Sequence, residues 1–458
     1  MKKGMKISII GAGLAGSEAA LQLAARGFEV RLFEMRPQVK TPVHQTADCA
    51  ELVCSNSLKS QKPASAAGML KHELTELGSY VFRIAEETSV SAGGALAVDR
   101  NAFSSAVTKK IENCSGIELI RDEVKSLRLL AQDSDCIVLA SGPLTSEALA
   151  QDLGHYLPQD YLAFYDAAAP IVSADSLNYD ILFRQNRYED KSGEGDYWNA
   201  PFNKNEYENF IEELKTADRV ILKSFESKDL FQACQPLEEI ARKGTDACRF
   251  GPMKPVGLVD PHTNHRPWAA LQLRAEDAHG QSYNLVGCQT NLTFPEQKRI
   301  FRLVPGLEEA EFLRYGVMHR NTFVDAPKVL DHTLCLKTKE SKNLSVPLYI
   351  AGQLSGTEGY CEAIRSGLHA ALSITARFNN VDVPCLPTTT VFGALIAYAT
   401  NPETKDYQPM HVNFGLIEPL EKRIRSKQDR YEAYRVRAEQ DLSIYRQTLV
   451  KSGLLESK

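Results

Sequence analysis

Short apolar runs that end at glycines organise the N-terminal part of the chain. The run from Lys6 to Ile10 leads into a glycine-rich turn, and residues 17–26 after it are rich in the helix formers Ala, Leu and Glu. Gly27 is suited to end that helix, and the run from Phe28 to Phe33 predicts a second strand. The pattern therefore predicts a strand–helix–strand unit at the start of the chain.

Two later apolar runs make the same transition from strand to glycine. Cys136 to Ala140 runs into Ser141-Gly142, and Pro347 to Ala351 runs into Gly352 before a helix expected from about Glu362. Residues 176–314 are instead rich in aromatic residues, Pro and Gly. We predict an α/β fold in which residues 1–175 and 315–458 form a discontinuous Rossmann-like domain of the glutathione-reductase type. An inserted α+β domain of residues 176–314 interrupts it.

Composition excludes several classes of protein. Of 458 residues, 43% are hydrophobic and 24% charged, as in a globular chain rather than a disordered or fibrous one. The formal net charge of −5 does not favour a nucleic-acid binder. Residues 421–446 predict a helix, and between residues 422 and 446 eight Lys or Arg accompany four acids. A solvated helix face is the ordinary interpretation of this charge pattern, and an RNA-binding face is the alternative.

The cysteines and the lack of targeting signals indicate the compartment. Ten cysteines without a CxxC pair are too sparse for a disulfide scaffold. The N-terminus lacks the apolar core of a signal peptide, and the longest later apolar run, Val391 to Ala399, is too short to span a bilayer. We expect a soluble, cytoplasmic protein without membrane contact.

A glycine fingerprint follows the first predicted strand. The G-x-G-x-x-G motif consists of Gly11, Ala12, Gly13, Leu14, Ala15 and Gly16. The first glycine permits the tight turn, the second the approach of a pyrophosphate, and the third close helix–strand packing, while the helix start offers N–H groups to phosphate. Glu34, at the end of the second strand, can accept hydrogen bonds from a ribose hydroxyl. We therefore predict a dinucleotide-binding site.

The predicted cofactor is FAD rather than NAD(P). The chain contains no second G-x-G-x-x-G motif. Turns at Gly142 and at Gly352-Gln353 can supply further backbone N–H groups to a long cofactor. In FAD enzymes of this architecture a late strand–glycine–helix turn commonly meets the rest of the cofactor, which is an argument by analogy of fold.

Two cysteines lie in polar surroundings. Cys54 is in an irregular loop after the first unit, and Cys234 has three Lys or Arg nearby in sequence. Nearby cations favour the reactive thiolate, although the ordinary interpretation of a single cysteine is a small buried hydrophobe. The spacing of Cys49, Cys54, Cys234 and Cys248 fits no zinc or iron–sulfur pattern, so no metal is expected.

Longer motifs resemble a known family over nearly the whole chain. They include AELVCSNSLKS, FGPMKPVGLVDP, YGVMHRNTF and AGQLSGTEGYCEAIRSGL. These segments are similar to those of the bacterial folate- and FAD-dependent tRNA (uracil-5-)-methyltransferases. The resemblance implies transfer of a methylene group from methylenetetrahydrofolate to C5 of the T-loop uridine of tRNA. It also implies reduction of that group by FAD, which NADPH or NADH recharges.

The resemblance implies catalytic roles for two thiols. By motif, one falls on Cys54 in AELVCSNS and the other on Cys234 in the F-x-x-C-x-P segment. C5 of uracil is a poor nucleophile, and a thiolate that adds to C6 turns the ring into an enolate whose C5 can attack an electrophilic methylene. We assign Cys234 as this nucleophile. Cys54 is assigned as the acceptor of the C5 proton, or as a thiol that interacts with a flavin-bound intermediate.

Other motif residues are candidates for substrate contacts. His319 and Arg320 can stack on or pair with folate, and the alternative for His319 is a structural histidine. Lys254 and the basic C-terminal helix can neutralise RNA phosphates. A T-loop uridine is stacked in folded tRNA, so it must be exposed or flipped before a thiol can reach C6.

Four alternatives to tRNA methylation remain at this point. Departures from the family pattern at His262, His265, Cys288 and Cys361 leave room for a paralogue that methylates ribosomal RNA. The related FAD-dependent modifiers of wobble uridines run longer, with a helical C-terminal extension. An FAD/NAD(P)H oxidoreductase acting on a small molecule would normally carry a second nucleotide motif. A non-catalytic flavin-containing RNA-binding protein would not depend on either thiol.

Overall fold

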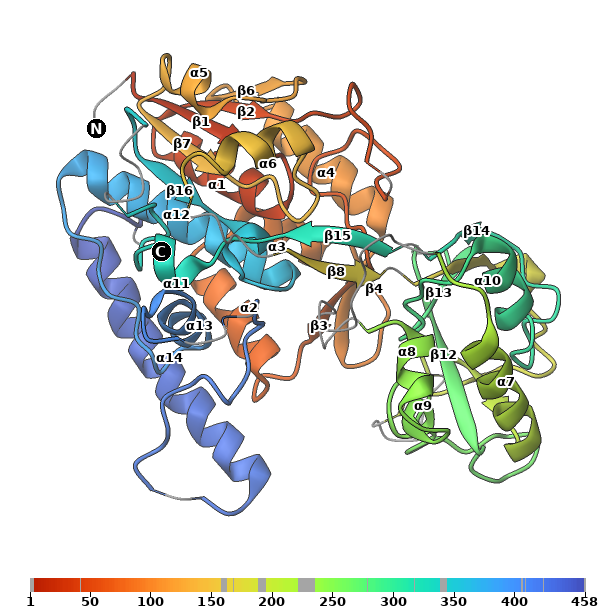
Figure 1. The fold of residues 1–458 in the computed structure, drawn as a ribbon. Coiled ribbons are helices and arrows are strands. Elements are labelled where there is room, and N and C mark those ends of the chain that lie inside the picture. Colours follow the sequence, from red (N-terminus) through yellow and green to blue (C-terminus); the bar gives the residue numbers. More distant parts are fainter. Residues whose placement is uncertain are drawn as a thin grey trace.

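The computed structural model describes residues 4–41, 43–157, 163–167, 169–187, 195–220, 235–277, 279–316, 318–337, 344–404, 407, 409–422 and 424–456, with the backbone alone at 163–167 and 318–321. Figure 1 shows two bodies of unequal size. The larger body contains the described residues of the ranges 4–157 and 323–456, and the smaller body contains those of the range 169–316. A two-stranded antiparallel ribbon of β8 (Ala163–Ala167) and β15 (Met318–Thr322) runs between them.

A five-stranded parallel sheet forms the centre of the larger body. Its order is β16-β7-β1-β2-β6, with all neighbouring strands parallel. The strands are β1 (Lys6–Ile10), β2 (Glu29–Phe33), β6 (Ile117–Ile120), β7 (Cys136–Leu139) and β16 (Leu348–Ile350). The predicted apolar runs thus form strands of one sheet, and their carboxyl ends bring the glycine turns after β1, β7 and β16 to one edge.

Helices pack around this sheet. Helix α1 lies against α12, which it approaches so closely that a Cβ on Gly367 would sit 2.1 Å from the Ala15 carbonyl oxygen. The helices are α1 (Leu14–Ala25), α2 (Ala66–Glu76), α3 (Tyr80–Glu87), α4 (Arg100–Glu112), α5 (Leu127–Ala131), α6 (Glu147–Leu153), α11 (Ala326–Val329), η4 (Gly352–Ser355), α12 (Tyr360–Asn379), α13 (Val391–Thr400) and α14 (Lys427–Lys451). The parallel sheet with its helices confirms the predicted α/β class.

Two elements of the larger body differ from the expectations. A three-stranded sheet of order β3-β5-β4, made of β3 (Ser57–Ser60), β4 (Ser89–Val90) and β5 (Ala95–Val98), follows the Cys54 loop and had no counterpart in the sequence pattern. The C-terminal helix α14 starts at Lys427 rather than at residue 421, because the Ser426 hydroxyl caps it by accepting from the Asp429 N–H.

The smaller body has its own six-stranded antiparallel sheet of order β10-β11-β12-β13-β9-β14. Its strands are β9 (Ile171–Ser173), β10 (Phe183–Arg184), β11 (Trp198–Phe202), β12 (Ala269–Ala275), β13 (Ser282–Leu285) and β14 (Phe312–Arg314). Its helices are η1 (Ala174–Ser176), α7 (Lys204–Thr216), α8 (Leu237–Arg242), α9 (Ala247–Phe250) and α10 (Phe294–Phe301). The predicted domain boundaries at 176 and 314 stay a prediction.

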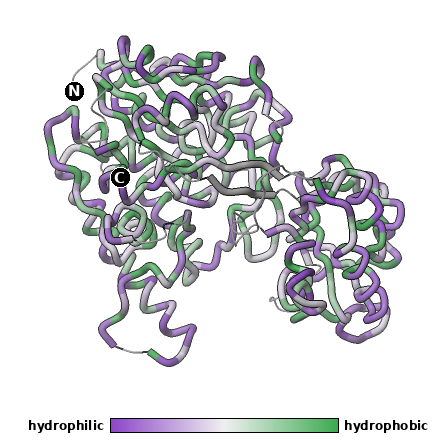
Figure 2. The backbone as a smooth tube through the Cα atoms, in the orientation of Figure 1, coloured by the Kyte–Doolittle hydropathy of each residue, from purple (hydrophilic) through white to green (hydrophobic). Residues whose placement is uncertain are grey.

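Each body has a separate hydrophobic core. One cluster of buried side chains runs from Ile7 to Ala438 in the larger body, and another from Val172 to Ala310 in the smaller one. In Figure 2 the hydrophobic segments pass through the interior, whereas hydrophilic residues dominate the outer loops. None of the helices in the described part of the chain is both long and apolar enough to cross a membrane.

Candidate active site

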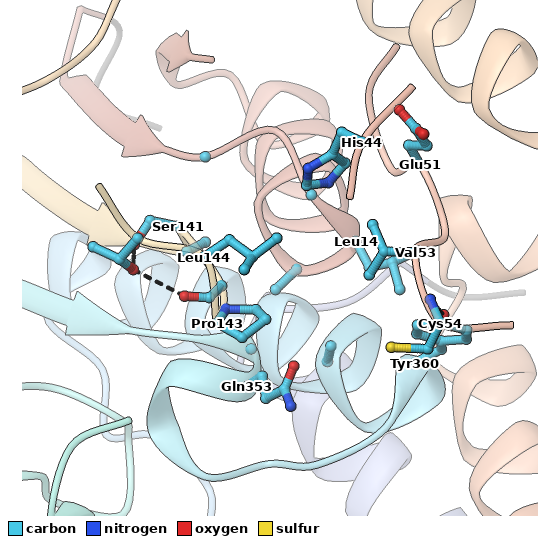
Figure 3. Close-up of a pocket in the computed structure, with 18 of the residues that line it drawn as sticks. Leu14, His44, Glu51, Val53, Cys54, Ser141, Pro143, Leu144, Gln353 and Tyr360 are labelled. Atoms are coloured by element: carbon cyan, nitrogen blue, oxygen red, sulfur yellow. Dashed lines mark hydrogen bonds between the residues drawn. The ribbon is translucent and has the colours of Figure 1, made fainter. Parts of the chain in front are cut away.

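A cavity of about 400 Å³ opens at the carboxyl edge of the parallel sheet. Its walls come from the turn after β1, the end of β2, the loop around Cys54, the turn after β7 and the segment from Gly352 to Ala363. Figure 3 shows Cys54 and Tyr360 on one side of this cavity and Ser141, Pro143 and Gln353 on another. Segments that are more than 300 residues apart in sequence therefore share one pocket.

The three fingerprint glycines have three different environments. Gly11 has φ +97°, and a Cβ there would lie 2.5 Å from the Ala140 carbonyl oxygen. A Cβ on Gly16 would lie 1.9 Å from the Gly11 carbonyl oxygen, so this residue permits the helix to pack on the strand. A Cβ on Gly13 would meet nothing within 4 Å. Gly13 caps α1 and faces open space, which fits a phosphate group at the helix start.

Glu34 closes the base of the turn. Its Oε2 accepts a hydrogen bond from the Ala12 N–H (3.1 Å), and its Oε1 lies 2.8 Å from Arg36 Nε. Arg36 also pairs with Glu51 across 3.0 Å. Burial by itself would raise the pKa of Glu34, but the hydrogen bonds and charge of Arg36 lower it. The carboxylate is thus ionised and lines the cavity, as an acceptor for a ribose hydroxyl must be.

The opposite wall is made of two further glycine turns. Gly142 (φ +68°) and Gly352 (φ +76°) both line the cavity in the left-handed region that favours glycine. The Gly352 N–H donates to the Ser366 hydroxyl (2.7 Å), and Gln353 Nε2 donates to Glu358 Oε2 (2.6 Å). These contacts fix the turn, and Gln353 stays part of the cavity wall.

The Cys54 loop is held from the start of α12. The Tyr360 hydroxyl oxygen accepts hydrogen bonds from the backbone N–H groups of Cys54 (3.0 Å) and Ser55 (3.2 Å). Burial raises the pKa of Tyr360 well above its usual value, so the hydroxyl stays protonated. The Cys54 side chain is partly exposed, and its sulfur points into the cavity (Figure 3). The sequence motif gave the thiol but no sign of the tyrosine that positions it.

Three arginines surround this loop. Arg314 Nη2 donates to the Val53 carbonyl (2.7 Å), and Arg100 donates to the Leu52 carbonyl. Arg274, from β12 of the smaller body, donates through Nη2 to the Ser55 hydroxyl (3.1 Å). The charges of Arg100 and Arg314 also interact with Cys54, and positive charge near a thiol favours its thiolate form. Sequence spacing could not find these arginines, because each comes from a different element.

The remaining predicted site residues either do not line this cavity or fall outside the part of the chain that the structure describes. Cys234 falls outside the described residues, which resume at Gln235 just before α8. His319 and Arg320 lie on β15, where their backbones pair with Asp166 and Tyr165 of β8, and their side chains are outside the described part. Lys254 follows α9 in the smaller body and is not among the described residues that line the cavity.

Gln289 lines the cavity but is not among the site residues predicted from the sequence. It comes from the smaller body and lines the same pocket as Cys54. Its carbonyl accepts from the Leu237 N–H (2.7 Å), and the neighbouring Asn291 N–H donates to Glu238 Oε1 (2.7 Å). These bonds fasten the cavity wall to the start of α8, the helix that follows the Cys234 segment directly. Among the described residues, no group of three or more His, Cys, Asp and Glu side chains is arranged to hold a metal ion.

The parallel sheet, the glycine turn and Glu34 define a chain of the Rossmann dinucleotide-binding class, with a cysteine at the wall of its cavity. The family model described as "Glucose inhibited division protein A" (GIDA) matches residues 6–382. Two crystal forms of Aquifex aeolicus GidA share the fold, with TM-scores of 0.69 and 0.67 at 15% and 16% identity. Each covers 99% of this chain, and the matches cover 74% and 78% of the GidA chains.

Curated relatives are more similar in sequence. The methylenetetrahydrofolate–tRNA-(uracil-5-)-methyltransferase TrmFO of Carboxydothermus hydrogenoformans is 48% identical over 95% of this chain and 98% of its own length. TrmFO proteins of Thermosynechococcus vestitus and Bacillus pumilus are 49% and 46% identical, over 96% and 97% of this chain and 94% and 99% of theirs. The chain therefore belongs to the GIDA family and to the TrmFO methyltransferases. This confirms the resemblance carried by the motifs and the predicted FAD-binding Rossmann-type fold.

Proposed function

We infer that this chain is a methylenetetrahydrofolate–tRNA-(uracil-5-)-methyltransferase, which forms 5-methyluridine in tRNA. One observation carries this inference: the Cys54 thiol faces the cavity built on the glycine turn, in a chain 48% identical to such an enzyme over 95% of its length. The carbon comes from methylenetetrahydrofolate, and NADPH or NADH supplies the reducing equivalents. Bound FAD provides the electrons that convert the transferred methylene group to a methyl group.

The chain's own residues fit this cofactor. The N–H groups at the start of α1, beside the open space at Gly13, would hold the pyrophosphate, and Glu34 would accept from the ribose. Gly142, Gly352 and Gln353 would contact the rest of the cofactor from the other wall. Leu14 and Ala15 complete the apolar lining near the helix start.

We propose that two thiols divide the chemistry on uracil. A thiolate of Cys234 forms a bond to C6, the ring carries the charge as an enolate, and C5 forms a bond to the methylene carbon. Cys54 then takes the C5 proton as the bond between the methylene carbon and its carrier nitrogen breaks, which leaves an exocyclic methylene at C5. Addition of a hydride equivalent to that carbon, with the electrons that bound FAD would supply, expels the Cys234 thiolate and restores the C5–C6 double bond. The arginines that hold the Cys54 loop support this role, because they favour a thiolate there.

The substrate contacts are proposed at a coarser level. The target is the T-loop uridine, which must leave its stack to enter the cavity. His319 and Arg320 are proposed to contact folate, and Lys254 to contact an RNA phosphate. We propose that residues 176–314 work as an inserted domain, which the separate core and sheet of the smaller body support. The proposed compartment is the cytoplasm, which keeps thiols reduced and contains tRNA.

The direct test uses unmodified tRNA, ¹⁴C-labelled methylenetetrahydrofolate and NADPH, followed by nucleoside analysis. We expect labelled 5-methyluridine in tRNA and none in ribosomal RNA run in parallel. Label in ribosomal RNA alone would identify the paralogous reaction. Oxidation of NADPH without label in either RNA would instead support an oxidoreductase of small molecules.

A further inference from the structure

The smaller body presents an exposed aromatic side chain on a fixed turn. Phe250 is the last residue of α9, and 75% of its surface is exposed. No other large hydrophobic residue in the described part of the chain is more exposed. The turn is not loose: the Phe250 N–H donates to Asp246 O, and both Gly251 and Met253 donate to Cys248 O. The backbone that carries Phe250 is therefore fixed, and the exposed face of its ring is accessible to a partner.

Cations accompany this ring. The Arg249 guanidinium lies 5.4 Å from the Phe250 ring centre and 3.9 Å from that of Trp268, and its Nε donates to the Trp268 carbonyl (2.8 Å). Lys204 Nζ lies 5.6 Å from the Trp268 ring centre and is 60% exposed. Each cation forms a loose ion pair: Asp246 is 3.9 Å from Arg249, and Glu208 is 3.7 Å from Lys204. We call Phe250, Arg249, Trp268 and Lys204 the aromatic–basic row.

The row is connected to the candidate active site by direct contacts. Cys248, two residues before Phe250, is buried with its Sγ 3.8 Å from the Leu237 carbonyl oxygen. Leu237 in turn donates to the carbonyl of Gln289, which lines the cavity with Cys54. In Figure 1, α8 and α9 lie side by side in the smaller body, on its side toward the larger one. The segment that carries Phe250 and Arg249 is therefore packed on the same helix, α8, that is hydrogen-bonded to the cavity wall at Gln289.

The chemistry of the row fits an unstacked RNA strand better than a protein. Nucleobases stack on aromatic rings whatever their sequence, and neighbouring Arg and Lys pair with phosphates. A protein partner would need a broader apolar face. Among the described residues near Phe250 in sequence, Val256 is the one other exposed large hydrophobic side chain, and it is 47% exposed. Arg249 is already held by Trp268, so its ordering costs little on binding.

We propose that the aromatic–basic row is the docking surface for the loop nucleotides that flank the target uridine. A flanking base stacks on Phe250 while Arg249 and Lys204 contact the backbone phosphates, and the target base turns into the cavity. This inference rests on the proposed function and adds to it the surface of the smaller body that holds the RNA.

The test measures the affinity of the full-length flavin-loaded protein for an unmodified tRNA transcript. Phe250→Ala is expected to weaken binding about tenfold or more, as loss of one base–aromatic stack does. Phe250→Trp should bind within about threefold of the parent, and Phe250→Leu should be as weak as the alanine variant. Leu129→Ala, on a 67% exposed side chain of α5 in the larger body, is the matched control and should not change tRNA affinity.

A second measurement separates the cations from the ring. Lys204→Gln should lower the slope of log affinity against log salt concentration by about 1, whereas Phe250→Ala should leave that slope unchanged. Unchanged tRNA affinity in Phe250→Ala, or full affinity in Phe250→Leu, would overturn the proposal, because either result would show that no base stacks on the Phe250 ring. Failure of the parent protein to bind or methylate tRNA would instead remove the proposed function itself.

Discussion

At the scale of single residues, the account depends on how Cys54 is held. The Tyr360 hydroxyl oxygen accepts hydrogen bonds from two backbone N–H groups of the Cys54 loop, and the hydroxyl itself stays protonated. Tyr360→Phe leaves both donors without this partner, and each unpaired buried donor costs about 1–3 kcal/mol. We expect methyl transfer to fall at least tenfold with flavin still bound. Single-turnover rates at equal flavin content measure this, and an unchanged rate would show that the loop holds its position without Tyr360.

The contrast between Cys54 and Tyr360 shows what the sequence could predict. The thiol was predictable because its motif resembles that of a known family. Tyr360 also lies in a family-like motif, AGQLSGTEGYCEAIRSGL, but its contact with the Cys54 loop was not predictable, since it lies 306 residues later and meets the loop only after α12 packs on α1. The contacts of Arg100, Arg274 and Arg314 with the Cys54 loop were not predictable for the same reason, because only the folded chain brings these residues together.

His44, at the cavity wall, links stability to pH. Burial, and next the Arg36 charge, lower the pKa of His44 from 6.5 to about 4. The unfolded chain therefore takes up a proton below pH 6.5 that the folded chain takes up only near pH 4, so stability falls as the pH drops through this window. His44→Gln removes this titrating group and therefore its pH-dependent contribution to the free energy of unfolding. Relative to the variant, the parent should lose about 2 kcal/mol of unfolding free energy between pH 7.5 and 5.

Urea unfolding at several pH values measures this difference. Above pH 7.5 neither state binds the proton at His44, so the gap between parent and variant should be constant there. Unfolding free energies that stay parallel from pH 7.5 to pH 5 would mean that His44 titrates alike in both states.

At the scale of elements, the glycine turn makes the sharpest prediction. Gly13→Val should cost the apoprotein only about 1 kcal/mol, the usual loss at a helix N-cap, because a Cβ there meets nothing within 4 Å, but it should lower FAD affinity at least a hundredfold by occupying the pyrophosphate space. Gly16→Val should instead destabilise the apoprotein, because its Cβ would sit 1.9 Å from the Gly11 carbonyl oxygen. Thermal unfolding of both apoproteins, with flavin titration, separates the two roles.

Each glycine variant serves as the control for the other. Equal loss of stability in both would contradict the assignment of Gly13 to the cofactor and Gly16 to packing. Retention of stoichiometric FAD by Gly13→Val would also contradict it.

Long, strongly patterned elements were predictable, and short ones were not. The runs that became β1, β7 and β16 are apolar and end at glycines, so local pattern sufficed. The strands β4 and β10 have two residues each, too few to show an alternation. The start of α14 was placed six residues early, because the charge pattern continues across Ser426 whereas the helix begins at its cap.

At the scale of the whole molecule, the two bodies are in contact at the Cys54 loop and at the start of α4. Arg274 of the smaller body donates to Asn56 Oδ1 (2.8 Å) and Ser55 Oγ, and Glu276 pairs with Arg100 of α4 at 2.7 Å. Arg274→Met removes both hydrogen bonds while keeping an unbranched apolar side chain in place of the arginine's aliphatic stem. We expect amide exchange of residues 52–56 to rise and methyl transfer to fall at least tenfold, with flavin retained.

Arg299→Met is the matched control for this interface. Arg299 is an arginine of the same body, but its ion pairs with Glu296 and Glu213 are on the surface, where such pairs contribute little. Normal exchange and normal turnover in Arg274→Met would show that contact between the bodies does not shape the Cys54 loop.

The central claim is that the thiols of Cys54 and Cys234 act on the same uracil, and its most direct test compares three proteins. The parent, Cys54→Ser and Cys234→Ser are brought to equal FAD content and supplied with unmodified tRNA, NADPH and labelled methylenetetrahydrofolate. The account predicts labelled 5-methyluridine from the parent and at least a thousandfold less from either variant. Labelled product from either serine variant at a rate near that of the parent would contradict it.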